Sequence, residues 1–124
     1  MELDDLIAEA GAARERAYAP YSGFRMGAAV RTSADTIVTG VLVENVSLGL
    51  AMCAERVALF GAVAAGHRPV ALAVASPRTD GAITFPCGAC LQVALELGGP
   101  DLQVVAVTVD GEIEQARLAD LLPR

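Results

Sequence analysis

Three cysteines, in the segments MCAERVALF (residues 52–60) and FPCGACLQV (residues 85–93), are all the thiols of the chain. Cys53 lies two residues before Glu55, and two residues separate Cys87 from Cys90. Thiols at such spacings are small buried apolar residues, a redox pair, or ligands of one metal ion. The elements that carry them decide between these interpretations.

Both segments are predicted to open helices. The first, over residues 53–65, is apolar on nearly every side and ends at Gly66, which is typical of a buried helix. The second, over about residues 87–97, follows Pro86. The thiols therefore fall in first turns, where unsatisfied N–H groups and the helix dipole favour thiolates.

Two apolar runs, residues 70–76 and 102–109, are predicted to be buried strands. With the helix between them they form a strand–helix–strand unit, which implies parallel pairing through a right-handed crossover. Helices that start at the same end of such a sheet bring their N-termini together, at the edge where these sheets bind ligands. Three thiolates converging there need a cation. Zinc accepts them tetrahedrally, and three protein ligands leave a fourth position for water, as in catalytic sites.

The remaining segments complete an α/β unit. A helix is predicted over residues 2–17, a hairpin of two strands over 25–31 and 36–43, a loop at ENVSLGLA, and a short helix near 115–121. We expect one domain over residues 1–124. Its fold class is a three-layer α/β/α sandwich, with a mixed sheet of about five strands that combines a β-hairpin with parallel βαβ units.

Composition excludes several classes of function. The net charge of −6 and the lack of a basic run argue against a nucleic-acid partner. No apolar stretch reaches the roughly 20 residues that a membrane span needs, so we expect no membrane partner. The start, MELDDLIAEA, is acidic and unlike a signal peptide. Three thiols without an export signal favour a cytoplasmic protein.

Glu55 distinguishes a catalytic zinc site from a structural one. A carboxylate beside zinc-bound water can take its proton and deliver it elsewhere, whereas a structural site has no need of it. Cys-x-Glu followed by Pro-Cys-x-x-Cys is the signature of zinc-dependent nucleobase deaminases.

Beyond this signature, the chain resembles the small, homotetrameric type of cytidine deaminase over nearly its whole length. The matching stretches are AYAPYSGFRMGAAV, VENVS, CAERVAL and PCGAC followed by Gln92. The resemblance implies the cytidine deaminase-like fold, zinc on Cys53, Cys87 and Cys90, and Glu55 as proton shuttle. The implied reaction is hydrolysis of cytidine or 2′-deoxycytidine to uridine or 2′-deoxyuridine, with release of ammonia, in pyrimidine salvage.

The resemblance also implies a substrate site. Phe24 would pack against the pyrimidine, the Ala54 backbone would contact the base, and Glu44 would bind a ribose hydroxyl. Family members commonly form tetramers whose active sites include residues of neighbouring chains, so a homotetramer with shared sites is expected. Arg56 is placed to donate hydrogen bonds to the thiolate sulfurs and to draw charge from the metal.

The chain departs from the family pattern mainly on the sugar side. Leu42 stands where the family usually has an Asn that shares the ribose contact. Leu48 and Gly49 replace a frequent Tyr-Pro, Leu91 replaces a usual Arg, and the end, LADLLPR, lacks the aromatic that commonly closes the pocket. We expect the reaction class to be kept and the sugar to meet fewer polar groups.

Other interpretations stay open at this point. The enzyme could act on another aminopyrimidine, such as free cytosine, a modified nucleoside or a nucleoside antibiotic. A non-enzymatic alternative is a zinc-stabilised domain used for assembly or binding. Among single residues, Phe24 could be plain core, Glu44 an ordinary loop carboxylate, and Arg56 a partner in a surface ion pair.

Overall fold

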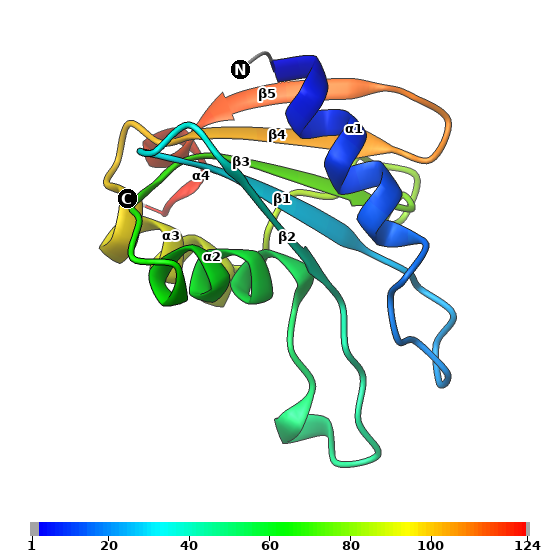
Figure 1. Cartoon of the computed structure of the whole chain (residues 1–124). Helices are drawn as coiled ribbons and strands as arrows, with labels where there is room; N and C mark the ends of the chain where they lie inside the picture. The colour runs from blue at the N-terminus through cyan, green and yellow to red at the C-terminus, as the bar shows by residue number, and fades with distance from the viewer. Residues whose placement is uncertain (1–2, 124) are drawn as a thin grey trace.

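The computed structural model describes residues 3–123, which fold around a mixed sheet of five strands in the order β2-β1-β3-β4-β5 (Figure 1). β1 pairs antiparallel with β2 and β3, β3 pairs parallel with β4, and β4 pairs antiparallel with β5. The strands are β1 (Gly27–Thr32), β2 (Ile37–Val41), β3 (Pro69–Ser76), β4 (Gln103–Thr108) and β5 (Ile113–Arg117).

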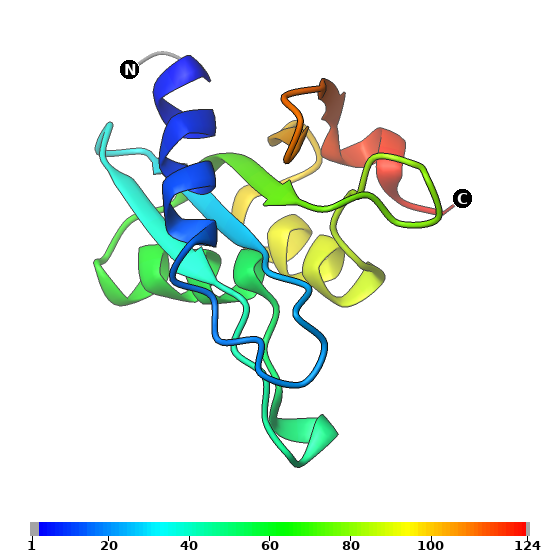
Figure 2. The same ribbon diagram turned by 90° about the vertical axis from the view of Figure 1, so that its right-hand side faces the viewer.

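Helices cover both faces of this sheet, which confirms the predicted α/β/α sandwich (Figure 2). α1 (Leu3–Arg14) lies on one face, while α2 (Ala54–Ala64) and α3 (Gly88–Gly98) lie on the other. Each face has its own cluster of buried apolar residues, built mainly from Ala, Val and Leu. Among residues 3–123, no helix combines the length and the apolar character that crossing a bilayer requires.

Two glycines let the helices approach the strands closely. A Cβ on Gly40 of β2 would lie 2.4 Å from the Ala54 carbonyl oxygen and 2.5 Å from the Ala58 nitrogen of α2. A Cβ on Gly27 of β1 would lie 2.4 Å from the Ala10 carbonyl oxygen of α1. The first contact holds the start of α2, and therefore Cys53 and Glu55, against the sheet.

The prediction of a helix near residues 115–121 is wrong for the first part of that range. Residues Ile113–Arg117 form β5, and only Leu118–Leu121 are helical, as α4. The dipeptide Asp110-Gly111 lies in the turn that joins β4 to β5, and such a dipeptide is a sequence signal for a hairpin. Gly111 adopts φ +93°, and the Thr108 N–H donates a hydrogen bond to the Glu112 carbonyl across the turn. β5 is exposed along nearly its whole length. Its sequence therefore lacks the alternation of apolar and polar residues that predicts a half-buried strand.

The predicted loop at ENVSLGLA projects from the body of the molecule (Figure 1). It carries a short 3₁₀ helix, η1 (Leu48–Leu50), at its far end. Val43 and Met52 exchange both of their backbone hydrogen bonds, at 2.9 and 3.0 Å, and so close the base of the loop. We call residues 43–52 the projecting loop.

Candidate active site

The three thiols gather at the N-termini of α2 and α3. Cys53 is the N-cap residue of α2, Cys87 is the N-cap residue of α3, and Cys90 lies in the first turn of α3. Their Sγ atoms all lie within 4.8 Å of one another, and those of Cys87 and Cys90 are 3.5 Å apart. α3 follows the end of β3, so the thiol cluster lies at the sheet edge where the parallel strands end.

This cluster has the dimensions of a zinc site. Thiolates placed tetrahedrally at about 2.3 Å from zinc are roughly 3.8 Å apart, which agrees with the observed spacing. All three residues are free thiols; Cys90 is buried, Cys53 is half-buried and Cys87 is exposed. A dithiol redox pair would leave Cys53 without a role, so the arrangement favours a metal site. Cys87 is exposed, so the cluster lies at the surface of the chain, and three protein ligands leave a fourth position of a tetrahedral zinc ion for water.

The thiols are set to lose protons to a cation. A hydrogen bond from Cys90 and the nearby Arg56 guanidinium lower the pKa of Cys53 to about 5, against the opposing effect of burial. The pKa of Cys90 is raised, because Cys90 donates that hydrogen bond and is buried near Glu55. Without a cation the cluster therefore keeps a proton that metal binding would displace.

Glu55 is the buried carboxylate beside this cluster. It is 1% exposed, and its Oε1 atom has no hydrogen-bond partner among the described residues. Burial, reinforced by the Cys53 thiolate, raises the pKa of Glu55 to about 7. An unpaired buried oxygen is costly, so this atom is suited to a partner that the protein itself does not supply, such as a water or a substrate nitrogen.

Arg56 contacts the sulfur of Cys53. Its Nη2 donates a hydrogen bond of 3.3 Å to Cys53 Sγ. Hydrogen bonds to Cys53 and to Cys90 raise the pKa of Arg56, so the guanidinium stays charged. Its position in the first turn of α2 places this positive charge against the Cys53 sulfur.

Glu44 is held by a network that the sequence analysis did not find. Its Oε1 accepts a hydrogen bond of 2.9 Å from the Tyr21 N–H, and its Oε2 accepts one of 2.5 Å from the Ser22 hydroxyl. These bonds, the Ser22 bond first, lower the pKa of Glu44. Ser22 is distant from Glu44 in sequence, and its only signal was its place in the matched stretch AYAPYSGF.

The other predicted substrate residues lie on neighbouring segments. Phe24 is half-buried, and its N–H donates to the Ser22 Oγ at 3.0 Å. Ala54 is fully buried at the start of α2. Leu42 is half-buried next to Val43, whose bridge to Met52 ties this segment to the residue before Cys53. The backbone therefore joins the predicted sugar and metal residues.

Leu48 and Leu91, two of the departures from the family pattern, lie in different settings. Leu48 is 89% exposed in η1, at the far end of the projecting loop and away from the chain's own thiols. Leu91 is buried in α3 as part of the core. Of these three departures, Leu42 lies nearest to Glu44 in the sequence, two residues before it.

An α/β/α sandwich with three thiols and a buried carboxylate at paired helix N-termini defines the class of zinc-dependent deaminases. The family model described as the cytidine and deoxycytidylate deaminase zinc-binding region matches residues 1–110. The chain belongs to this family, which confirms the resemblance found in the sequence, and zinc is its cofactor.

Known cytidine deaminases are similar to this protein over nearly its whole chain. A cytidine deaminase of Halalkalibacterium halodurans is 42% identical over 99% of this chain and 92% of its own length. The crystal structure of a cytidine deaminase from Burkholderia pseudomallei is 49% identical and superposes with a TM-score of 0.91, covering 99% of this chain and 98% of that one. The structure from Mycobacterium tuberculosis gives a TM-score of 0.83 at 39% identity, over 99% and 95% of the two chains.

Proposed function

We propose that the protein catalyses the zinc-dependent hydrolysis of cytidine and 2′-deoxycytidine to uridine and 2′-deoxyuridine, with release of ammonia, in pyrimidine salvage. The observation that carries this proposal is Glu55, a buried carboxylate beside three converging thiols, with one oxygen that has no hydrogen-bond partner among residues 3–123. A zinc-stabilised binding domain would gain nothing from burying a carboxylate there, because the group costs free energy and fills no coordination position.

Cys53, Cys87 and Cys90 would hold the zinc ion. Bound zinc would supply a Lewis acid that lowers the pKa of water, so that hydroxide is available near neutral pH to attack C4 of the pyrimidine. Three thiolates on a divalent cation leave a net negative centre, which weakens that effect. The Arg56 guanidinium and the N-termini of α2 and α3 offset part of this charge, because all three direct positive charge at the sulfurs.

Glu55 would move the protons. It would accept one proton from the attacking water and deliver it to N3 of the base. It would then take the remaining proton from the new hydroxyl group on C4 and pass it to the amino group, which leaves as ammonia while C4 becomes a carbonyl. Water adds and ammonia departs, so the balance is cytidine plus water to uridine plus ammonia. A pKa raised to about 7 suits a group that must both accept and donate a proton near neutral pH.

Phe24, Ala54 and Glu44 would bind the rest of the nucleoside. Phe24 offers a half-buried ring for the face of the base, and the Ala54 backbone at the α2 N-terminus offers a polar contact to its edge. Glu44 would accept a hydrogen bond from a sugar hydroxyl. Leu42 adds no hydrogen bond beside it, so sugar recognition depends on Glu44.

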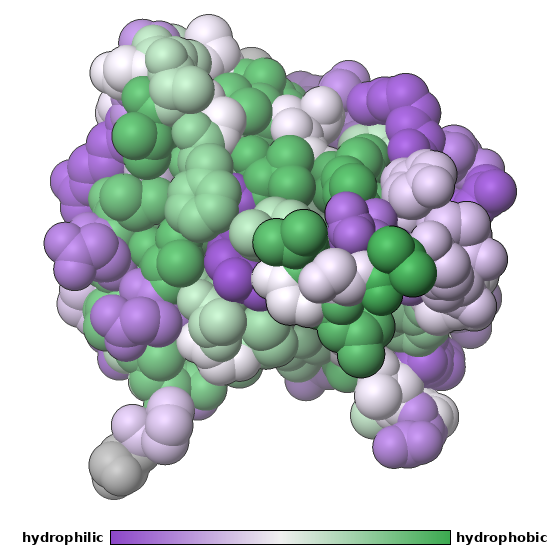
Figure 3. All heavy atoms as spheres, turned by 90° about the horizontal axis from the view of Figure 1, so that it is seen from below, coloured by the Kyte–Doolittle hydropathy of each residue, from purple (hydrophilic) through white to green (hydrophobic). Residues whose placement is uncertain are grey.

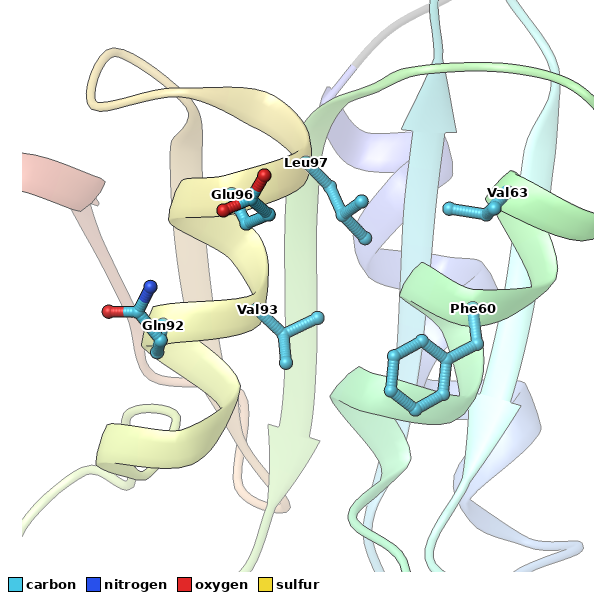
Figure 4. A pocket seen from close by; sticks show the side chains of 6 residues that line it. All are labelled: Phe60, Val63, Gln92, Val93, Glu96 and Leu97. Carbon is cyan, nitrogen blue, oxygen red and sulfur yellow. The ribbon is translucent and has the colours of Figure 1, made fainter.

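We further propose that the protein assembles as a homotetramer with shared active sites. α2 and α3 are separated by an apolar groove of about 440 Å³ (Figure 4). Its lining residues are Phe60, Val63, Gln92, Val93, Glu96 and Leu97.

Hydrophobic side chains cover much of the face that carries α2, α3 and the projecting loop (Figure 3). At the loop end, Val46 is 81% exposed and Leu48 is 89% exposed. Large apolar areas of this kind on a small domain mark protein interfaces. The resemblance to homotetrameric deaminases supports further copies of this chain as the partners. In such an assembly the loop end would reach a neighbouring copy.

We also propose a cytoplasmic location. Zinc-binding thiols must stay reduced, and a reducing compartment keeps them so. The three free thiols support this proposal.

One assay tests the proposed function. The purified protein is analysed for zinc and then offered cytidine, 2′-deoxycytidine, cytosine and modified nucleosides, with ammonia release as the readout. We expect about one zinc per chain and turnover of both cytidine and 2′-deoxycytidine. Turnover of cytosine or a modified nucleoside alone would favour another aminopyrimidine deaminase, and full zinc without any turnover would favour a binding domain.

A further inference from the structure

Ser22 connects the residues proposed to bind the base and the sugar. Its hydroxyl donates to Glu44 Oε2 at 2.5 Å and accepts from the Phe24 N–H at 3.0 Å. The turn that makes both bonds possible includes Gly23, which adopts φ +70°, a conformation that glycine accepts readily. One exposed side chain therefore fixes the distance between Phe24 and Glu44.

The same network fills most of the acceptor capacity of Glu44. An ionised carboxylate offers about four lone-pair sites. The Tyr21 N–H at 2.9 Å and the Ser22 N–H at 3.3 Å occupy Oε1, and the Ser22 hydroxyl occupies one site on Oε2. Among residues 3–123, these three bonds leave one acceptor site free on Oε2, and the Ser22 hydroxyl holds that oxygen in a defined orientation.

The neighbouring residue offers no second polar group. Leu42 is two residues away on the same extended segment, and its side chain neither donates nor accepts. The backbone N–H of Leu42 already donates to the Met26 carbonyl at 3.0 Å. Recognition of the sugar on this side therefore depends on the single free site of Glu44.

We propose that Ser22 is a positioning residue that orients Glu44 and leaves it one free acceptor site, so that the enzyme recognises one sugar hydroxyl. This inference rests on the proposed function, because it assigns Glu44 to the sugar. Ser22 itself does not touch the substrate. It acts by keeping the free lone pair of Glu44 Oε2 at a fixed place relative to the Phe24 ring.

The test compares substrates that differ only in their hydroxyl groups. Steady-state kinetics are measured with cytidine, 2′-deoxycytidine, 3′-deoxycytidine and 2′,3′-dideoxycytidine for the parent and for Ser22→Ala. In the parent, removal of one of the 2′ and 3′ hydroxyls should raise KM, and removal of the other should change KM little. In Ser22→Ala, KM for substrates with the recognised hydroxyl should rise about tenfold, as expected for a weakened hydrogen bond to a charged group.

The dideoxy substrate separates sugar recognition from other effects. Its KM should be unchanged in Ser22→Ala, because it lacks the group that Glu44 binds. The kcat values should stay within about twofold of the parent, because the contact is remote from C4 and similar in the ground and transition states. Ser22→Thr keeps a hydroxyl and should restore the parent KM.

Ser33→Ala is the matched control, since Ser33 lies in the β1–β2 turn and accepts a hydrogen bond from the Arg68 N–H. It should leave every KM unchanged. An unchanged cytidine KM in Ser22→Ala, or an equal rise for 2′,3′-dideoxycytidine, would overturn the role of Ser22 while the proposed function stands. A parent protein that deaminates none of the four substrates would instead overturn the proposed function.

Discussion

Burying Glu55 next to three thiols is unfavourable for the isolated chain. A buried polar atom without a partner costs about 1–3 kcal/mol, and a charged group costs more. The network at Glu44 has the opposite character, because that carboxylate is stabilised by three donors from Tyr21 and Ser22. One carboxylate is therefore left available for proton transfer and the other is held for binding, and single substitutions should separate these roles.

Replacing a proposed zinc ligand tests the metal site. Cys90→Ala should lose zinc and much of the stability, because two thiolates would remain without full compensation of their charge. Metal analysis and thermal unfolding measure both effects. The parent treated with a strong chelator is the control and should unfold near the temperature of the variant. A Cys90→Ala protein with a full complement of zinc would refute the assignment.

Replacing Glu55 tests proton transfer. Glu55→Gln keeps the size of the side chain but cannot carry a proton, so zinc content and fold should persist. We expect kcat to fall by about 10²–10⁴-fold or more, because Glu55 serves more than one step. Glu9→Gln, on the exposed side of α1, is a matched control that should leave kcat unchanged. Activity of Glu55→Gln within a few-fold of the parent would exclude the proposed role.

Leu42 tests sugar recognition. A sugar hydroxyl that loses water beside Leu42 without gaining a partner costs about 1–3 kcal/mol. We therefore expect cytidine and 2′-deoxycytidine to be handled about equally well, and Leu42→Asn to improve cytidine turnover through KM more than through kcat. Steady-state kinetics of both proteins decide this. Tight cytidine binding by the parent together with weaker binding by Leu42→Asn would contradict this prediction, because Leu42 would then favour cytidine binding more than Asn does.

At the scale of elements, close packing of α2 on β2 positions the site. Gly40 allows this contact, because any Cβ there would collide with the backbone of α2 at Ala54 and Ala58. Gly27 allows the equivalent contact of β1 with α1 on the other face of the sheet. The two glycines thus offer a matched pair, because Gly40 faces the helix of the site and Gly27 faces the helix on the opposite side of the sheet.

Gly40→Ala and Gly27→Ala should both destabilise the fold, by about 1–3 kcal/mol, because the added methyl forces a helix away from the sheet. Only Gly40→Ala should also speed the release of zinc to a chelator, since it displaces the N-terminus of α2 that carries Cys53. Chemical denaturation and a zinc-release assay measure the two effects. Equal rates of zinc release in the two variants would mean that α2 packing does not control the metal site.

The sequence predicted the elements with strong local signals. The buried strands β3 and β4, the apolar α2, and the thiols at helix starts were all found, because burial and helix termini leave clear patterns. β5 was missed because an exposed edge strand needs no apolar alternation. The bond between Ser22 and Glu44 was missed because it joins segments that only the folded chain brings together.

At the scale of the whole molecule, the apolar face of α2 and α3 remains uncovered in a single chain. Phe60 and Val63 of α2 are about half exposed beside the groove. An isolated chain would thus present hydrophobic surface next to the elements that carry its metal ligands. Assembly should therefore stabilise both the fold and the site.

Phe60→Lys should break the proposed assembly, because a charge would be buried at its interface. Sedimentation or light scattering should show a tetramer for the parent and smaller species for the variant. Ala8→Lys, on the exposed side of α1, introduces the same charge away from the groove and should remain tetrameric. A parent that is monomeric at high concentration would contradict the proposed assembly outright.

The bridge between Val43 and Met52 has a consequence for how such a protein can change over generations. It closes the projecting loop at its base, so the apolar end around η1 is separated from the residues next to Glu44 and Cys53. If the protein assembles as proposed, mutations at the loop end can compensate for changes on a neighbouring copy while the base of the loop keeps its geometry. In the proposed assembly, the contacts of the loop end could thus change over generations while the residues beside Glu44 and Cys53 keep their positions.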